Sequence, residues 1–176
     1  MKILIIGASG SGTTTLGKAL SVATNFKHLD VDDYYWKVTN PPFQEKISLA
    51  ERTKNLTIDF HNHTNVIVSG SLVSWGKAWK TAFDLAIFVT LDKNIRMQRL
   101  EQREFERYGD KLVTDLKVKE TSEAFLAWAK RYDDSTFTGR SMKIHLDWLA
   151  LLSCKTLTID SALSLENNVS TVLRKI

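Results

Sequence analysis

Residues 7–16 read Gly7-Ala8-Ser9-Gly10-Ser11-Gly12-Thr13-Thr14-Thr15-Leu16, with three glycines among small hydroxyl side chains. The apolar run Lys2–Ile6, which has strand character, leads directly into them. Thr14–Ala23, which follows, carries apolar residues at helical spacing. Gly7 and Gly12 have the separation of the pattern G-x-x-x-x-G-K-S/T, and Thr14 occupies its hydroxyl position. The sequence therefore predicts a phosphate-binding loop between a strand and a helix.

The composition of this loop suits a bound nucleotide. Glycines let the backbone approach a ligand closely and adopt conformations that other residues avoid. Successive N–H groups, together with the positive end of the following helix, then hold phosphate oxygens. The Thr14 hydroxyl is placed to bind Mg²⁺ beside the phosphates. We therefore expect ATP and Mg²⁺ as cofactors, bound by Gly7, Ser9, Gly10, Ser11, Gly12, Thr13, Thr14 and Thr15.

One position departs from the pattern. Thr13 stands where the pattern has a lysine, whose positive charge normally faces the β- and γ-phosphates. Lys18 comes later, too far around the helix to take its place. A loop that supports transfer, a loop that only binds ATP and a glycine turn that binds nothing all stay open at this residue.

Four further apolar runs accompany the first, and all are β-branched or aliphatic without alternation. Such runs are typical of parallel strands that are covered on both faces. The five predicted strands are Lys2–Ile6, Lys27–Val31, Asn65–Ser69, Leu85–Leu91 and Thr156–Ile159. The predicted helices are Thr14–Ala23, Ile47–Phe60, Lys93–Glu106, Asp115–Arg131, Ser141–Leu152 and Leu165–Leu173. This alternation predicts an α/β fold of three layers, with a five-stranded parallel sheet between helices.

The chain of 176 residues is expected to form a single domain, because 43% of its residues are hydrophobic and no linker or repeat interrupts it. The interval from Lys93 to Lys155 has no strand candidate. We expect two or three helices there, with residues 110–140 forming a helical lid over the site. Ligands of such sheets bind outside the carboxyl ends of the strands, so the residues after each strand are the functional candidates.

Charge and cysteine content exclude several classes of protein. The formal net charge of +4 suits a phosphorylated substrate, but it is too small to indicate nucleic acid. The single cysteine, Cys154, excludes a disulfide framework, a multi-cysteine zinc site and an iron–sulfur cluster. No apolar stretch has the roughly 20 residues of a membrane span, and the N-terminal run is too short for a signal segment. We expect a cytoplasmic monomer or homodimer whose partner is a small-molecule phosphate acceptor.

Charged side chains follow two of the other predicted strands. The second strand ends in Leu29-Asp30-Val31-Asp32-Asp33, and the fourth is followed by Arg99 and Arg103, which share one helix face. Structural roles are open as well: Asp32 or Asp33 could cap a helix, and the two arginines could pair with neighbouring glutamates.

Together these features resemble the P-loop small-molecule kinases of the adenylate, cytidylate and shikimate kinase group. The resemblance covers most of the chain and is strongest over Gly7–Thr15. The run Gly-Ser-Gly-Thr-Thr-Thr is also similar to the loop of some archaeal cytidylate kinases, which implies that Thr13 is compatible with activity. The resemblance implies an adenylate kinase-like P-loop NTPase fold. It also implies ATP-dependent phosphoryl transfer to a small molecule, with a nucleoside or nucleotide as the favoured acceptor.

The same resemblance implies roles for the charged residues. The Asp-x-Asp pattern of shikimate and gluconate kinases corresponds to Asp30, near Mg²⁺, and to Asp32, which orients or deprotonates the acceptor hydroxyl. The R-x-x-x-R pattern of adenylate kinases corresponds to Arg99 and Arg103, of which one stacks on the ATP base and the other contacts phosphates.

Two arginines of the lid-like segment are further candidates. Arg131 and Arg140 flank Tyr132-Asp133-Asp134, and either could neutralise charge on the transferring phosphate. After the last strand, Asp160-Ser161-Ala162 matches the position where these kinases pack the adenine. His145, further along the helical interval, is expected to be structural.

The sequence departs from the adenylate kinase pattern after the third strand. The run Val68-Ser69-Gly70-Ser71-Leu72 lacks both the aspartate and the arginine of Asp-Gly-Phe-Pro-Arg, which weakens the case for AMP as acceptor. Aromatic residues on two nearby loops could form a wall for a flat acceptor or pack in the core; they are Tyr35, Trp36, Trp75 and Trp79. Two other functions also stay open: a nucleotide-binding regulatory module without kinase activity, and a P-loop protein linked to nucleic acid.

Overall fold

A computed structural model describes all 176 residues and contains one five-stranded parallel sheet. The strands are β1 (Lys2–Gly7), β2 (Lys27–Asp30), β3 (Val66–Ser69), β4 (Leu85–Thr90) and β5 (Lys155–Asp160). Their order in the sheet is β2-β3-β1-β4-β5, and every neighbouring pair is parallel. The predicted sheet is confirmed, and each predicted strand end lies within one residue of the observed end.

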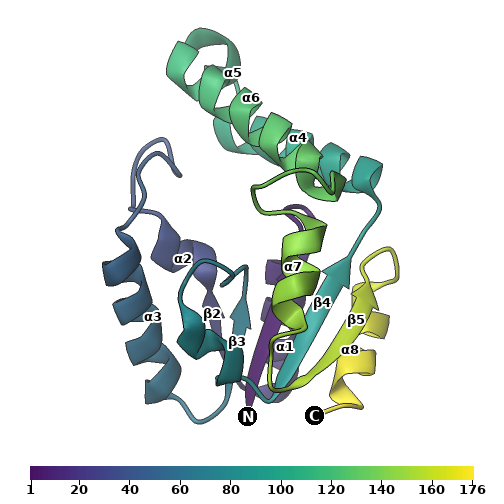
Figure 1. The fold of residues 1–176 in the computed structure, drawn as a ribbon. Coiled ribbons are helices and arrows are strands. Elements are labelled where there is room, and N and C mark those ends of the chain that lie inside the picture. Colours follow the sequence, from purple (N-terminus) through teal and green to yellow (C-terminus); the bar gives the residue numbers. More distant parts are fainter.

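Helices cover both faces of the sheet, which makes the three predicted layers (Figure 1). Helices α1 (Thr13–Thr24) and α8 (Leu165–Leu173) pack on one face, whereas α3 (Leu49–Asn62) and α7 (Met142–Leu149) pack on the other. Short elements such as α2 (Val31–Tyr35) and the 3₁₀ helix η1 (Lys77–Thr81) were not predicted, because they are too short to show a helical period.

Strand β1 shows why the apolar runs do not alternate. Ile3 and Ile5 belong to the buried cluster that contains Leu20 of α1. Leu4 and Ile6 belong to the cluster on the other face, with Phe60 of α3. Successive side chains of a strand point to opposite faces, so a strand covered on both faces is apolar at every position.

A helical hairpin projects beyond the carboxyl ends of the strands (Figure 1). Its elements are α4 (Lys93–Tyr108), α5 (Lys111–Thr114), α6 (Leu116–Lys130) and the 3₁₀ helix η2 (Arg131–Asp133). The side chains of Asp92 and Asp115 cap α4 and α6. The hairpin also contacts the loop after α2, because the Tyr108 hydroxyl donates to the carbonyl oxygen of Pro42 at 3.1 Å. Residues 110–140, where we expect the lid, form part of this hairpin and the segment after it.

The carboxyl ends of the strands meet at one edge of the sheet, below the hairpin (Figure 1). Strand β3 pairs with both β1 and β2, so Ser69 lies between Ile5 and Asp30 in register. The segments that leave β1, β2 and β3 are therefore neighbours in space. No helix of the chain is both long enough and apolar enough to cross a lipid bilayer.

Candidate active site

The glycine-rich loop joins β1 to α1 and requires glycine at two positions. Gly10 and Gly12 have φ angles of 81° and 92°, in the left-handed region that other residues rarely adopt. A Cβ on Gly10 would lie 2.9 Å from the carbonyl oxygen of Arg96, so the loop also packs against the start of α4. The conformation and the packing of the loop both depend on the absence of side chains here.

The loop presents a set of free backbone donors. The N–H groups of Gly10, Gly12, Thr13 and Thr14 donate to no acceptor within the protein. Helix α1 is also the only helix of eight or more residues whose N-cap residue makes no side-chain hydrogen bond. Unpaired N–H groups at a helix N-terminus form a site suited to phosphate oxygens.

Three other residues of the predicted loop set have different surroundings. The Ser11 N–H donates to the carbonyl oxygen of Ala8 at 3.1 Å, and its hydroxyl is fully buried without a hydrogen-bond partner. A Cβ on Gly7 would lie 2.6 Å from that hydroxyl, so the two residues pack together beneath the loop. Thr15 is exposed on α1. Ser11 therefore shapes the loop and has no free N–H to offer a phosphate.

Thr14 and Asp30 form a pair of oxygen groups next to the loop. The Thr14 hydroxyl donates to Asp30 Oδ2 at 2.7 Å. The other carboxylate oxygen of Asp30 accepts from the Asp32 N–H at 3.0 Å, which makes Asp30 the N-cap of α2. The capping role that the sequence left open for Asp32 or Asp33 therefore belongs to Asp30, the last residue of β2. A hydroxyl beside a carboxylate offers the hard oxygen atoms that Mg²⁺ prefers, so these residues fit the metal.

Asp32 lies within range of the charges of Asp30 and of two arginines. The residue is exposed, but the surrounding protein partly withdraws its carboxyl group from water. This desolvation raises the pKa of Asp32, and the negative charge of Asp30 raises it further. The nearby charges of Arg140 and Arg103 oppose the rise. A carboxylate with a raised pKa is a better proton acceptor than an ordinary aspartate.

Arg140 reaches the phosphate-binding loop from the segment before α7. Its Nη2 donates to the Ser9 hydroxyl at 3.1 Å, and its guanidinium lies 4.7 Å from the centre of the Trp128 ring. Its Nε is buried without a hydrogen-bond partner, and no carboxylate forms an ion pair with it. Burial lowers the pKa of Arg140, whereas Asp32 raises it. The loop therefore has a cation held against it by stacking and a hydrogen bond.

Helix α4 brings its two predicted arginines to different places. Arg99 Nη1 contacts the Ser161 hydroxyl at 3.4 Å, and a Cβ on Gly12 would lie 3.9 Å from the same nitrogen. Arg99 thus links the loop to the segment after β5, where the resemblance places the adenine. Arg103 lies over the ring of Phe125 on α6 and within electrostatic range of Asp32.

Arg131 differs from the other predicted arginines. It is exposed, pairs with Asp134 at 3.5 Å and lies 4.2 Å from the centre of the Phe137 ring. The structure gives it no contact with the loop or the acidic pair. Arg140, the other predicted arginine of the lid-like segment, contacts the loop instead.

Arg52 of α3 is a candidate that the sequence did not single out. It is 8% exposed, and its guanidinium lies 4.1 Å from the Tyr35 ring centre and 4.9 Å from that of Trp75. No side chain forms an ion pair or hydrogen bond with it. A signal was present: Arg52 lies four residues before Leu56 on the apolar face of the predicted helix, where a charged residue is out of place.

The predicted aromatic wall divides into two groups. Tyr35 and Trp75 contact the Arg52 guanidinium, and Trp36 packs on Tyr35 with 4.9 Å between the ring centres. Trp79 packs instead in the core against Phe60, 5.3 Å between ring centres. Trp75 contacts Arg52 from within the same buried core cluster as Trp79, whereas Tyr35 and Trp36 are half-buried.

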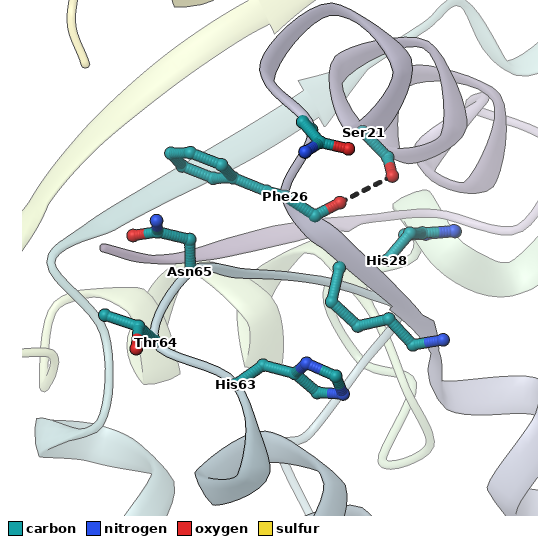
Figure 2. Close-up of a pocket in the computed structure, with 8 residues that line it drawn as sticks. Ser21, Phe26, His28, His63, Thr64 and Asn65 are labelled. Atoms are coloured by element: carbon teal, nitrogen blue, oxygen red, sulfur yellow. Dashed lines mark hydrogen bonds between the residues drawn. The ribbon is translucent and has the colours of Figure 1, made fainter.

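A polar depression of about 570 Å³ lies elsewhere (Figure 2). Figure 2 shows Ser21 donating to the carbonyl oxygen of Phe26, which precedes β2. Asn65 in the same depression precedes β3. The depression is therefore at the amino ends of the strands, opposite the loop. Its lining residues are Ser21, Asn25, Phe26, Lys27, His28, His63, Thr64 and Asn65.

Residues 3–124 match the model of a protein family described as an AAA domain. The chain belongs to this family. The part of this AAA domain that matches runs from β1 into α6, so it includes the glycine-rich loop, the Asp30–Asp32 pair, Arg52 and both arginines of α4. Arg140 lies outside it.

Three known proteins are similar to this AAA domain chain over most of their length. The uncharacterized protein YqaC of Bacillus subtilis (strain 168) is 41% identical, over 97% of this chain and 94% of its own. A uridine kinase of Ligilactobacillus salivarius (strain UCC118) is 28% identical, over 74% of this chain and 81% of its own. A cytidylate kinase of Methanococcus vannielii is 28% identical, over 76% of this chain and 80% of its own.

Solved structures show the same architecture. A shikimate kinase from Bacteroides thetaiotaomicron superposes with a TM-score of 0.59 at 16% identity, covering 100% of this chain and 99% of its own. A deoxyadenosine kinase from M. mycoides with bound dATP gives 0.58 at 17% identity, covering 99% and 98%. These similarities confirm the predicted α/β P-loop kinase fold. At 16% and 17% identity they show the fold and not the activity.

Proposed function

We propose that the chain is an ATP-dependent phosphotransferase whose acceptor is a small molecule, a nucleoside monophosphate in particular. One observation carries the proposal: free N–H groups of the glycine-rich loop, the Thr14–Asp30 pair and Asp32 converge at one edge of the sheet. A phosphate cradle, a metal position and a proton acceptor are the parts that phosphoryl transfer requires. The similarity to a uridine kinase and a cytidylate kinase supports a nucleoside-containing acceptor.

The nucleotide side follows from the loop. The N–H groups of Gly10, Gly12, Thr13 and Thr14 hold the phosphates of ATP. Arg99, which contacts Ser161 after β5, lies beside the adenine of the bound nucleotide. Thr14 and Asp30 hold Mg²⁺, which when bound offsets the negative charge of the phosphates. Arg140 supplies the cation that Thr13 does not, because its guanidinium already lies on Ser9 without a carboxylate partner.

The acceptor side follows from Asp32 and its surroundings. Where the attacking oxygen is a hydroxyl or a singly protonated phosphate, Asp32 accepts its proton, and the raised pKa of Asp32 favours that step. Arg103, near Asp32, stabilises charge that develops during transfer. The unpaired guanidinium of Arg52 suits an anionic group, and the aromatic residues around it suit a flat ring. A nucleoside monophosphate has both.

Replacing Arg52 with methionine tests whether Arg52 binds the phosphate of the acceptor substrate. We expect kcat/KM for a nucleoside monophosphate to fall about 10- to 100-fold, because a charge-assisted hydrogen bond to its phosphate is lost. The melting temperature should not fall, since methionine removes a buried charge that has no carboxylate partner. Steady-state kinetics and thermal unfolding measure both effects. Lys54→Met, which removes an exposed charge from the same helix, should change neither. Equal losses for a monophosphate and for its parent nucleoside would contradict the assignment.

Titration calorimetry with ATP, with and without Mg²⁺, tests the function as a whole. We expect saturable binding that weakens when Mg²⁺ is removed, followed by acceptor-dependent ADP release with AMP, CMP, UMP or their nucleosides. No binding at millimolar ATP would contradict the proposal.

A second candidate is a nucleotide-binding regulatory module, which the lysine-less loop favours. Tight Mg·ATP binding without ADP release for any acceptor of the panel would support this module over the kinase.

A further inference from the structure

A buried histidine connects two segments around the site. His145 of α7 is fully buried. Its Nδ1 lies 2.8 Å from the hydroxyl oxygen of Tyr132 in η2. Its Nε2 lies 3.0 Å from the hydroxyl oxygen of Ser71, which follows β3. The ring therefore joins the segment before α7 to the turn at the end of β3.

The protonation of the ring follows from its surroundings. Burial, with a smaller effect of the Arg140 charge, lowers the pKa of His145 to about 3. The imidazole is therefore neutral at neutral pH, so one ring nitrogen donates and the other accepts. Burial also raises the pKa of Tyr132, which keeps its hydroxyl proton.

The direction of both hydrogen bonds is decided by Tyr132. This side chain is buried, and His145 Nδ1 is the only partner of its hydroxyl. The hydroxyl proton must be donated to Nδ1, because otherwise it would be buried without an acceptor. Nε2 then carries the ring proton and donates it to the Ser71 oxygen. The proton of the Ser71 hydroxyl is left free to point away from His145.

Ser71 lies near the candidate site, where its hydroxyl can donate that proton to a ligand. It is half-buried and follows Ser69, which lies between Asp30 of β2 and Ile5 of β1 in the sheet. The Gly70 N–H donates to the Ile5 carbonyl oxygen at 2.9 Å, so this turn stays attached to β1 just before the phosphate-binding loop. The turn after β3 therefore lies between the phosphate-binding loop, which follows β1, and the segment with Asp30 and Asp32, which ends β2.

We propose that Ser71 is a hydrogen-bond donor of fixed direction toward an oxygen lone pair of the acceptor substrate. His145 and Tyr132 are positioning residues that set this direction. This inference rests on the proposed function. An acceptor with an oxygen at this point is selected, and an analogue without it leaves the Ser71 proton unpaired.

The first test reads the ring directly and needs no activity. Histidine in the protein is labelled with nitrogen-15, and the His145 signals are assigned as those missing from His145→Gln. Long-range proton–nitrogen correlations at neutral pH are expected to show Nε2 protonated and Nδ1 unprotonated. Tyr132→Phe, which removes the proton donor to Nδ1, should shift this balance. A doubly protonated ring, or a proton on Nδ1 in the parent, would overturn the inference.

The second test measures what Ser71 does for the acceptor. In Ser71→Ala we expect KM for the acceptor to rise about three- to tenfold while KM for ATP is unchanged. Ser71→Thr, which keeps the hydroxyl, should restore the lower value. Ser74→Ala, an exposed serine on the same segment, is the control. An unchanged acceptor KM in a correctly folded Ser71→Ala variant would overturn the inference.

Failure of the proposed function and failure of the inference about Ser71 give different results. If the parent binds ATP and releases ADP with an acceptor, the proposed function stands, and an effect of Ser71→Ala on ATP alone removes only this inference. If no acceptor supports ADP release, the proposed function and the role of Ser71 in it are both overturned. The labelling experiment then still shows whether the direction of the hydrogen bonds was assigned correctly.

Discussion

Replacement of Asp32 by asparagine is expected to lower the rate of phosphoryl transfer to a protonated acceptor oxygen by about 10²- to 10⁴-fold while leaving the affinity for Mg·ATP unchanged. Asparagine keeps the shape of the side chain and removes its capacity to accept a proton. In the parent, the rate should fall as the pH falls through the pKa of Asp32, which is raised above the ordinary aspartate range. A pH–rate profile and titration calorimetry measure the two quantities. A variant that keeps full activity would contradict the assigned role.

The stability of this variant separates a chemical effect from unfolding. Because the pKa of Asp32 is raised in the folded chain, the folded state binds its proton more tightly than the unfolded state. Ionisation at neutral pH therefore costs folding free energy, and asparagine should not lower the melting temperature. Changing Asp30 instead would be harder to interpret, because that residue also caps α2 and accepts from Thr14. An asparagine variant that melts well below the parent would make the loss of activity structural.

Replacement of Arg140 by methionine is expected to lower kcat by about 10²- to 10³-fold. The guanidinium lies on Ser9 of a loop that lacks its lysine, so its loss leaves the phosphates without this nearby cation. Arg174→Met, an exposed arginine at the end of α8, should leave kcat unchanged. Single-turnover kinetics with Mg·ATP and the acceptor measure the chemical step.

A double variant makes this prediction sharper. If Arg140 supplies the charge that Thr13 does not, then Thr13→Lys should restore part of the activity that Arg140→Met removes. The same substitution in the parent should have a smaller effect, because a cation is already present there. A large gain from Thr13→Lys in a nearly inactive parent would instead indicate a decayed kinase. If Thr13→Lys raised activity equally in the parent and in Arg140→Met, the idea that Arg140 supplies the missing charge of the lysine would be contradicted.

Much of the fold was predictable because its signals are local. A strand covered on both faces must be apolar at every position, so the five runs could be located to within one residue. The glycine-rich loop is contiguous, and its pattern depends on spacing alone. Asp30 and Thr14 could be expected near each other because the carboxyl ends of parallel strands share one edge.

The partners of the charged side chains depended on the tertiary structure. Arg131 and Arg140 were equivalent candidates in the sequence, but packing on Trp128 directs Arg140 to Ser9, 131 residues away, and an ion pair holds Arg131 at Asp134. The cap of α2 shifted from Asp32 or Asp33 to Asp30, since the backbone turn sets which carboxylate reaches a free N–H. Arg52 and the His145–Ser71 bond likewise depend on which helices meet. Hydrophobic period and glycine spacing are properties of neighbouring residues, whereas burial and the pairing of charges arise only when distant segments pack together.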